Sequence, residues 1–118
     1  MKKEYKMLLE KALAEFDAFS LVWREDMEFE DSARQFEEKL QPFLLKEERT
    51  DCWPGTQLLY KSSIVRTYQV SQDSINVLRR FDSVFEFVFP HYPEDLAFYQ
   101  DGTLVYASIA HEKYNWYE

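Results

Sequence analysis

Two histidines and three carboxylates near the C-terminus have the side chains best suited to catalysis or metal binding. They are His91, Glu94, Asp95, His111 and Glu112. An imidazole beside a carboxylate can act as a general base with its orienting partner, and two histidines with one carboxylate can hold a catalytic metal. No HExxH or HxH spacing accompanies these residues, so the pattern indicates no particular metal site.

Local structure offers each of these residues another role. His111 and Glu112 follow a predicted strand, in which neighbouring side chains point to opposite faces and do not readily bond to each other. Glu94 and Asp95 follow a proline, and Asp side chains commonly accept backbone hydrogen bonds in turns. We therefore expect no catalytic residue, metal or cofactor. The five residues remain a second candidate site, open to a hydrolase mechanism if they meet in one pocket.

The rest of the chain has few groups that could carry out catalysis. Cys52 is the only cysteine, which excludes an internal disulfide and a cysteine-based zinc site. The two glycines, Gly55 and Gly102, lie too far apart for a phosphate-binding loop, and no G-x-S-x-G nucleophile elbow occurs. Nucleotide-dependent enzymes are therefore disfavoured.

The densest charge lies in an acidic segment, residues 25–31, where five of seven positions are acidic. They are Glu25, Asp26, Glu28, Glu30 and Asp31. The whole chain has 22 acidic against 14 basic residues, a net charge of −8. This charge repels nucleic-acid phosphates and favours a basic protein partner, such as a basic toxin domain. We expect the acidic segment to be the partner site, and the alternative is a solvated loop.

The N-terminal part predicts a long helix. Apolar residues recur at helical spacing from Tyr5 to Trp23, with Lys and Glu between them, which favours one helix over residues 3–24. Phe19, Leu21 and Trp23 also alternate, so a strand is the competing interpretation for the end of this segment. We prefer the helix, because no turn residue separates the two parts.

A second helix is predicted after the acidic segment. Ser32 stands three residues before Gln35, the spacing of a capping box, and apolar residues follow at helical spacing. Pro42 removes an amide donor, so the helix must kink there or restart. The charged residues 46–49 form its exposed end.

Two strand-like runs follow, at residues 56–60 and 64–70. The second is rich in β-branched and aromatic residues, and the linker between them is short and polar, which predicts an antiparallel pair. Ser71 can then cap a third helix with a wide apolar stripe, and Pro90 ends it.

A final hairpin is the clearest local prediction. Asp101-Gly102 favours a two-residue type I′ turn between strands over residues 96–99 and 103–110. The tail 114–117 either extends the last strand or folds over the core. The predicted order is α-α-β-β-α-β-β, a single α+β domain over residues 1–118. Its sheet has about four mainly antiparallel strands, with helices on one face.

No apolar run approaches the ~7–15 residues of a signal-peptide core or the ~20 residues of a membrane span. The single cysteine is compatible with a reducing compartment. We therefore expect a cytoplasmic protein without a membrane partner.

Four segments carry a resemblance to known proteins: Trp53-Pro54-Gly55-Thr56, Tyr92-Pro93-Glu94-Asp95-Leu96, Phe98-Tyr99 and Ser108-Ile109-Ala110-His111-Glu112. They resemble a family of small, uncharacterised bacterial proteins with WPGT, YPEDLxFF-like and S-x-x-HE motifs. Its members carry an automatic sporulation-stage label, and these motifs imply no chemistry. The resemblance spans about residues 40–113. Small acidic α+β proteins are also similar, as a class, to immunity proteins that neutralise a secreted toxin domain.

Three functions fit these observations. The acidic surface and the lack of a catalytic pattern favour a non-enzymatic bacterial protein that binds another protein, in an immunity-like or regulatory role. The first alternative is a small hydrolase that uses His91 or His111 with nearby carboxylates. The second is a homodimeric structural protein that pairs through its aromatic tail or a sheet edge, so the chain is expected to be a monomer or a homodimer.

Overall fold

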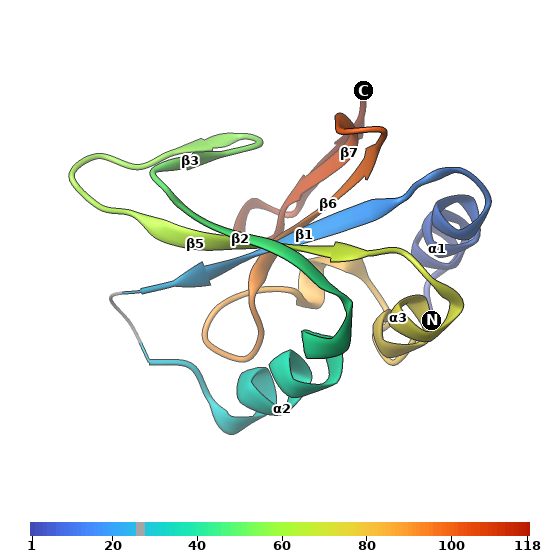
Figure 1. Ribbon diagram of the computed structural model, residues 1–118, viewed down its shortest axis with the longest axis horizontal. Coiled ribbons are helices and arrows are strands. Elements are labelled where there is room, and N and C mark those ends of the chain that lie inside the picture. The colour runs from blue at the N-terminus through green and yellow to red at the C-terminus, as the bar shows by residue number, and fades with distance from the viewer. Residues whose placement is uncertain (26–27) are drawn as a thin grey trace.

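The computed structural model describes residues 1–25 and 28–118, and its helices pack on one face of a large sheet (Figure 1). The helices are α1 (Lys3–Glu15), α2 (Asp31–Leu40) and α3 (Gln72–Leu78), with short 3-10 helices η1 (Gln41–Phe43), η2 (Val84–Glu86) and η3 (Ala110–Glu112). The strands are β1 (Ala18–Arg24), β2 (Leu44–Thr50), β3 (Cys52–Trp53), β4 (Thr56–Gln57), β5 (Ser63–Gln69), β6 (Glu94–Gln100), β7 (Thr103–Ile109) and β8 (Tyr114–Tyr117).

The main sheet has six strands in the order β2-β5-β1-β6-β7-β8, and β3 and β4 form a separate small hairpin. Every pairing in the described residues is antiparallel. The predicted α+β class with a mainly antiparallel sheet is therefore confirmed. The predicted four strands and their order are wrong, because two segments expected to be helical are strands β1 and β2.

The helix predicted over residues 3–24 ends at Glu15, and residues 18–24 form the central strand β1. β1 pairs with β5 on one side and with β6 on the other. Six of its seven residues are buried, because one face meets the helices and the other is largely covered. The alternation of Phe19, Leu21 and Trp23 correctly indicated this strand. The helical spacing was correct for α1 and misleading for residues 18–24.

The second predicted helix also ends early. α2 stops at Leu40, Pro42 lies in the 3-10 turn η1, and the charged run 46–49 lies in edge strand β2 instead of extending the helix. Proline explains the stop, since it cannot supply the amide that a continuing helix needs. The charged side chains suit an edge strand, because one side of the strand faces water.

The first predicted hairpin is wrong in its partners. Residues 56–57 pair with 52–53, and β5 pairs with β1 and β2. The third helix begins as predicted at Ser71, whose hydroxyl accepts a hydrogen bond from the Ser74 amide. It ends at Leu78, well before Pro90, and the wide apolar stripe continues through irregular chain and η2.

The last hairpin is confirmed. β6 and β7 pair across Asp101 and Gly102, whose φ angles are 51° and 79°, the positive values that a type I′ turn requires. The tail extends the sheet as edge strand β8, which resolves the two alternatives for residues 114–117.

The main core lies between the sheet and the helices. Its largest fully buried side chains come from every layer, among them Leu9, Phe19, Leu40, Tyr68, Leu78, Phe87, Phe98 and Tyr106. The opposite face of the sheet carries no α-helix in the described residues and lies under the β3–β4 hairpin (Figure 1). None of the described helices is long and apolar enough to cross a membrane.

Candidate functional site

Three residues of the second candidate site meet at the start of β6. One side-chain ligand atom from each of Glu94, Asp95 and His111 lies within 4.8 Å of the others. The two carboxylates are buried, with 4% and 3% exposure, and His111 is exposed. The structure therefore assembles part of the predicted cluster, and the next question is which partners each side chain has.

Glu94 is held by Arg24 at the end of β1. Arg24 Nε donates to Glu94 Oε1 at 3.0 Å and Nη2 donates to Oε2 at 3.3 Å, a two-pronged arrangement. The guanidinium carbon also lies 5.4 Å from the centre of the Trp53 ring. A buried carboxylate requires such pairing, because unpaired charge is costly away from water.

Asp95 accepts two hydrogen bonds from distant parts of the chain. Trp53 Nε1 donates to Oδ2 at 2.8 Å, and the Ala110 amide donates to Oδ1 at 3.0 Å. Burial raises the pKa of Asp95 above its usual range, and these two hydrogen bonds act in the opposite direction. The carboxylate therefore ties β3 and η3 to the start of β6.

The segments that carry the family resemblance converge at this point. Trp53 reaches Asp95, and Gly55 packs so closely on Ile109 that a Cβ atom would lie 2.7 Å from Ile109 Cδ1. Ser108 Oγ donates to the Leu96 carbonyl at 2.7 Å. We call Arg24, Trp53, Glu94, Asp95 and Ala110 the buried anchor. Its contacts stabilise the fold.

His91 and Glu112 have other partners. His91 Nδ1 lies 2.5 Å from Glu30 Oε2, and Ser32 Oγ donates to the His91 carbonyl, so His91 contacts the start of α2. His111 Nε2 lies 3.9 Å from Glu112 Oε1. This distance is longer than a hydrogen bond. Strand alternation does not apply to the pair, because the strand ends at Ile109 and both residues lie in η3.

The acidic segment is largely paired within the chain. Glu25 accepts from Arg49 Nε at 2.7 Å and from Ser62 Oγ at 3.2 Å. Glu30 binds His91, and Asp31 lies 3.8 Å from Arg34. Glu28 is exposed, and Asp26 lies outside the described residues.

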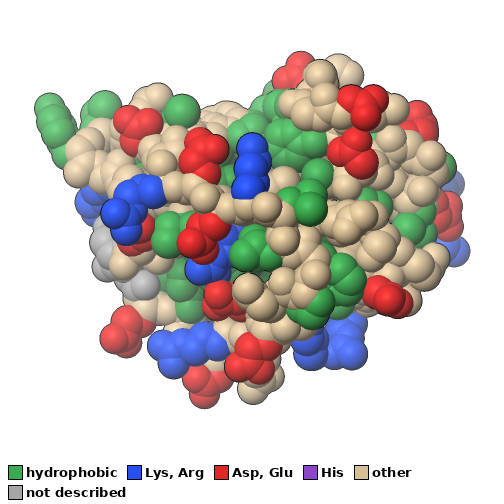
Figure 2. Space-filling view, in the orientation of Figure 1, with side chains coloured by type: hydrophobic (Ala, Val, Ile, Leu, Met, Phe, Trp, Pro, Cys, Tyr) green, Lys and Arg blue, Asp and Glu red, His purple; other side chains and the backbone are tan. Residues whose placement is uncertain are grey.

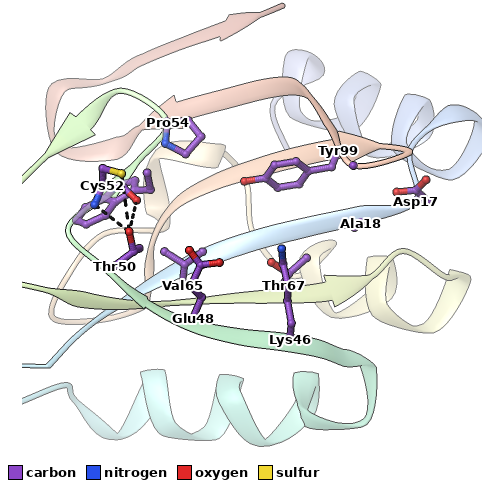
Figure 3. Close-up of a pocket in the computed structure, with 12 residues that line it drawn as sticks. Asp17, Ala18, Lys46, Glu48, Thr50, Cys52, Pro54, Val65, Thr67 and Tyr99 are labelled. Atoms are coloured by element: carbon purple, nitrogen blue, oxygen red, sulfur yellow. Dashed lines mark hydrogen bonds between the residues drawn. The ribbon is translucent and has the colours of Figure 1, made fainter.

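A groove of about 250 Å³ lies on the face of the sheet opposite the helices (Figure 3). Its lining consists of Asp17, Ala18, Lys46, Glu48, Thr50, Cys52, Trp53, Pro54, Val65, Thr67, Tyr99 and Gly102. Tyr99 shares a hydrogen bond of 3.0 Å with Ser20, and burial raises its pKa. The sequence-based prediction missed this groove, because it treated β1 and β2 as helices.

The loop between β4 and β5 projects from one end of the sheet (Figure 1). Leu59 is 76% exposed, and Tyr60 is 104% exposed with a φ of 65°. Ser62 connects this loop to Glu25 of the acidic segment. Sequence reasoning missed this pair of apolar side chains, because it assigned residues 56–60 to a strand. We call residues 58–62 the apolar loop.

Comparison of the chain with protein-family models, with curated proteins and with solved structures found no match. The resemblance of the motif segments to a bacterial family therefore stays a prediction.

Proposed function

We propose that this chain is a non-enzymatic module that binds a basic protein through the apolar loop and the adjoining acidic segment. The observation that carries this proposal is the exposure of Leu59 and Tyr60, at 76% and 104%. Aromatic side chains are enriched at the energetic centres of protein interfaces, and exposed apolar patches often mark interaction sites.

The conformation of Tyr60 adds to this support. A non-glycine residue with φ of 65° is uncommon, and holding it there costs on the order of 1 kcal/mol. No burial of the side chain offsets that cost within the chain, because Tyr60 is fully exposed. Insertion of the ring into a partner's pocket would supply the missing burial.

Charge defines the class of partner. The net charge of −8 speeds the approach of a basic protein, and acidic side chains are spread over the face seen in Figure 2. Glu25 lies beside the apolar loop, because it accepts a hydrogen bond from Ser62 of that loop. Glu28, three residues further along the chain, is exposed. A basic toxin domain is one partner of this kind, which is the immunity-like role that the acidic α+β class suggested.

The experiment is photo-crosslinking from position 60. Tyr60 is replaced by a photoreactive phenylalanine in the source cells, and the crosslinked protein is identified by mass spectrometry. Met7 is the matched control position, because it is an exposed apolar residue on α1, at 56% exposure. A basic protein that crosslinks from position 60 and not from position 7 supports the proposal, and the absence of any adduct specific to position 60 refutes it.

Binding of the identified protein is then measured with purified variants. We expect Leu59→Ser and Tyr60→Ser each to weaken binding by roughly tenfold or more, as at interface hot spots, and Met7→Ser to leave it unchanged. Glu28→Lys should weaken binding more at low than at high salt, since salt screens exposed charges. Equal affinities for all four variants would refute the assigned surface.

A further inference from the structure

A pocket of about 330 Å³ lies on the helix side of the sheet, away from the groove on the other face. Residues of α1, η2, β7 and β8 form its walls, and Leu8, Val84 and Phe85 contribute apolar lining. A cavity of about 150 Å³ lined by apolar side chains can hold benzene. This pocket, at about 330 Å³, therefore has room for a molecule of two fused rings.

Tyr106 of β7 brings a buried hydroxyl to this pocket. The residue is 1% exposed, and its hydroxyl accepts a hydrogen bond of 2.9 Å from Nδ2 of Asn115, which also lines the pocket. Burial raises the pKa of Tyr106 to about 12, so the hydroxyl keeps its hydrogen at neutral pH. Within residues 1–25 and 28–118 that hydrogen has no acceptor. A buried donor is costly to leave unpaired, so its acceptor has to come from a molecule in the pocket.

The charges around the pocket favour a neutral molecule. The two charged residues of the lining, Lys2 and Glu4, are both exposed and opposite in sign, so together they add no net charge. The net charge of −8 on the whole chain opposes an anion. Tyr5, which is buried in the same lining, already donates its hydroxyl hydrogen to the Leu78 carbonyl at 2.6 Å. A neutral molecule with an acceptor opposite Tyr106 therefore fits this lining best.

We propose that this pocket binds a small neutral aromatic molecule of two fused rings, whose hydrogen-bond acceptor receives the hydroxyl hydrogen of Tyr106. The rings pack against Leu8, Val84 and Phe85, and the single polar contact fixes their orientation, as in ligand pockets that are mostly apolar. Residues 58–62 of the apolar loop do not line the pocket, so ligand binding here and protein binding at the loop are independent proposals.

The test is a titration of the 118-residue chain with quinoline and with indole at neutral pH, followed by the amide chemical shifts in NMR spectra. Both probes are neutral two-ring molecules of similar size. Quinoline has an acceptor nitrogen and no N–H, whereas indole has an N–H and no acceptor. We expect quinoline to bind with a dissociation constant of about 1 mM or below and to shift the amides around Leu8, Val84 and Tyr106. Indole should bind roughly tenfold more weakly, because it cannot accept from Tyr106.

Two matched variants examine the role of the hydroxyl. Tyr106→Phe keeps the ring and removes the donor, so it should weaken quinoline binding roughly tenfold and leave indole binding unchanged. Unchanged indole binding also shows that the pocket of the variant is intact. Tyr99→Phe is the control, because it removes a tyrosine hydroxyl from the groove on the other face of the sheet. It should leave the affinities for both probes at their wild-type values.

The comparison of the two probes on the wild type depends on no variant. A wild type that shows no saturable shift with quinoline up to about 10 mM overturns the proposal, as do shifts confined to residues outside the pocket. Equal affinities for quinoline and indole overturn it as well, because they show that no acceptor is selected. The same holds for a folded Tyr106→Phe variant that binds quinoline as tightly as the wild type, or for a Tyr99→Phe variant that loses quinoline binding.

Discussion

Replacing Trp53 by phenylalanine should destabilise the protein more than a comparable change at the surface. The substitution keeps an aromatic ring but removes the indole N–H that donates to Asp95 Oδ2 at 2.8 Å. Trp53 is 7% exposed and Asp95 is 3% exposed, so water cannot readily replace the lost donor. One oxygen of a buried carboxylate is then left without a partner.

The expected loss follows from two contributions. A hydrogen bond to a charged group contributes about 1.5–3 kcal/mol, and the smaller ring leaves a space that costs up to about 1 kcal/mol more. The free energy of unfolding at neutral pH should therefore fall by about 1.5–4 kcal/mol. Urea denaturation followed by circular dichroism measures this change.

The loss should also depend on pH. Burial raises the pKa of Asp95 above its unfolded value, so its contribution to stability is largest at low pH and is lost as pH rises through the folded pKa. Trp53→Phe removes a donor that favours the charged form and raises that pKa further. The difference between variant and wild type should thus be smaller at about pH 4, near the usual aspartate pKa, than at neutral pH.

Trp116→Phe is the matched control. Its indole N–H donates to the exposed Glu118 at 3.2 Å, so the smaller ring is the main loss, which should cost no more than about 1 kcal/mol. A Trp53→Phe variant as stable as Trp116→Phe at neutral pH would refute the role given to the buried anchor. A loss that is equal at both pH values would show that packing, and not the charge of Asp95, accounts for it.

Three further predictions concern stability. Gly55→Ala should lower the free energy of unfolding by about 2–4 kcal/mol, because the new Cβ meets packed side chains and the backbone has a φ of 84°. Gly102→Ala should lower it by only about 1–2 kcal/mol, because its Cβ meets open space at a φ of 79°. Thermal unfolding of the two variants measures the difference. Arg24→Met should cost about 3–5 kcal/mol by leaving the buried Glu94 carboxylate without its partner, and adding Glu94→Leu should recover most of that loss in urea denaturation. Tyr60→Ser should change the unfolding free energy by less than about 0.5 kcal/mol, since the side chain is fully exposed, and a larger loss would show that the apolar loop packs on the domain.

The sequence by itself determined the features that depend on neighbouring residues. The hairpin of β6 and β7 followed from Asp101 and Gly102, because the turn needs positive φ at both positions. The start of α3 followed from the Ser71 cap. These are local steric and hydrogen-bonding constraints, which a short stretch of sequence carries completely.

Only the tertiary structure decided the assignments of β1 and β2. Residues 18–24 have apolar spacing that fits a helix or a strand, and pairing with β5 and β6, distant in the chain, selected the strand. A helix satisfies its backbone within the segment, whereas a strand depends on partners that the local pattern does not show. The buried anchor has the same origin, since Trp53, Asp95 and Ala110 meet only after the sheet has formed.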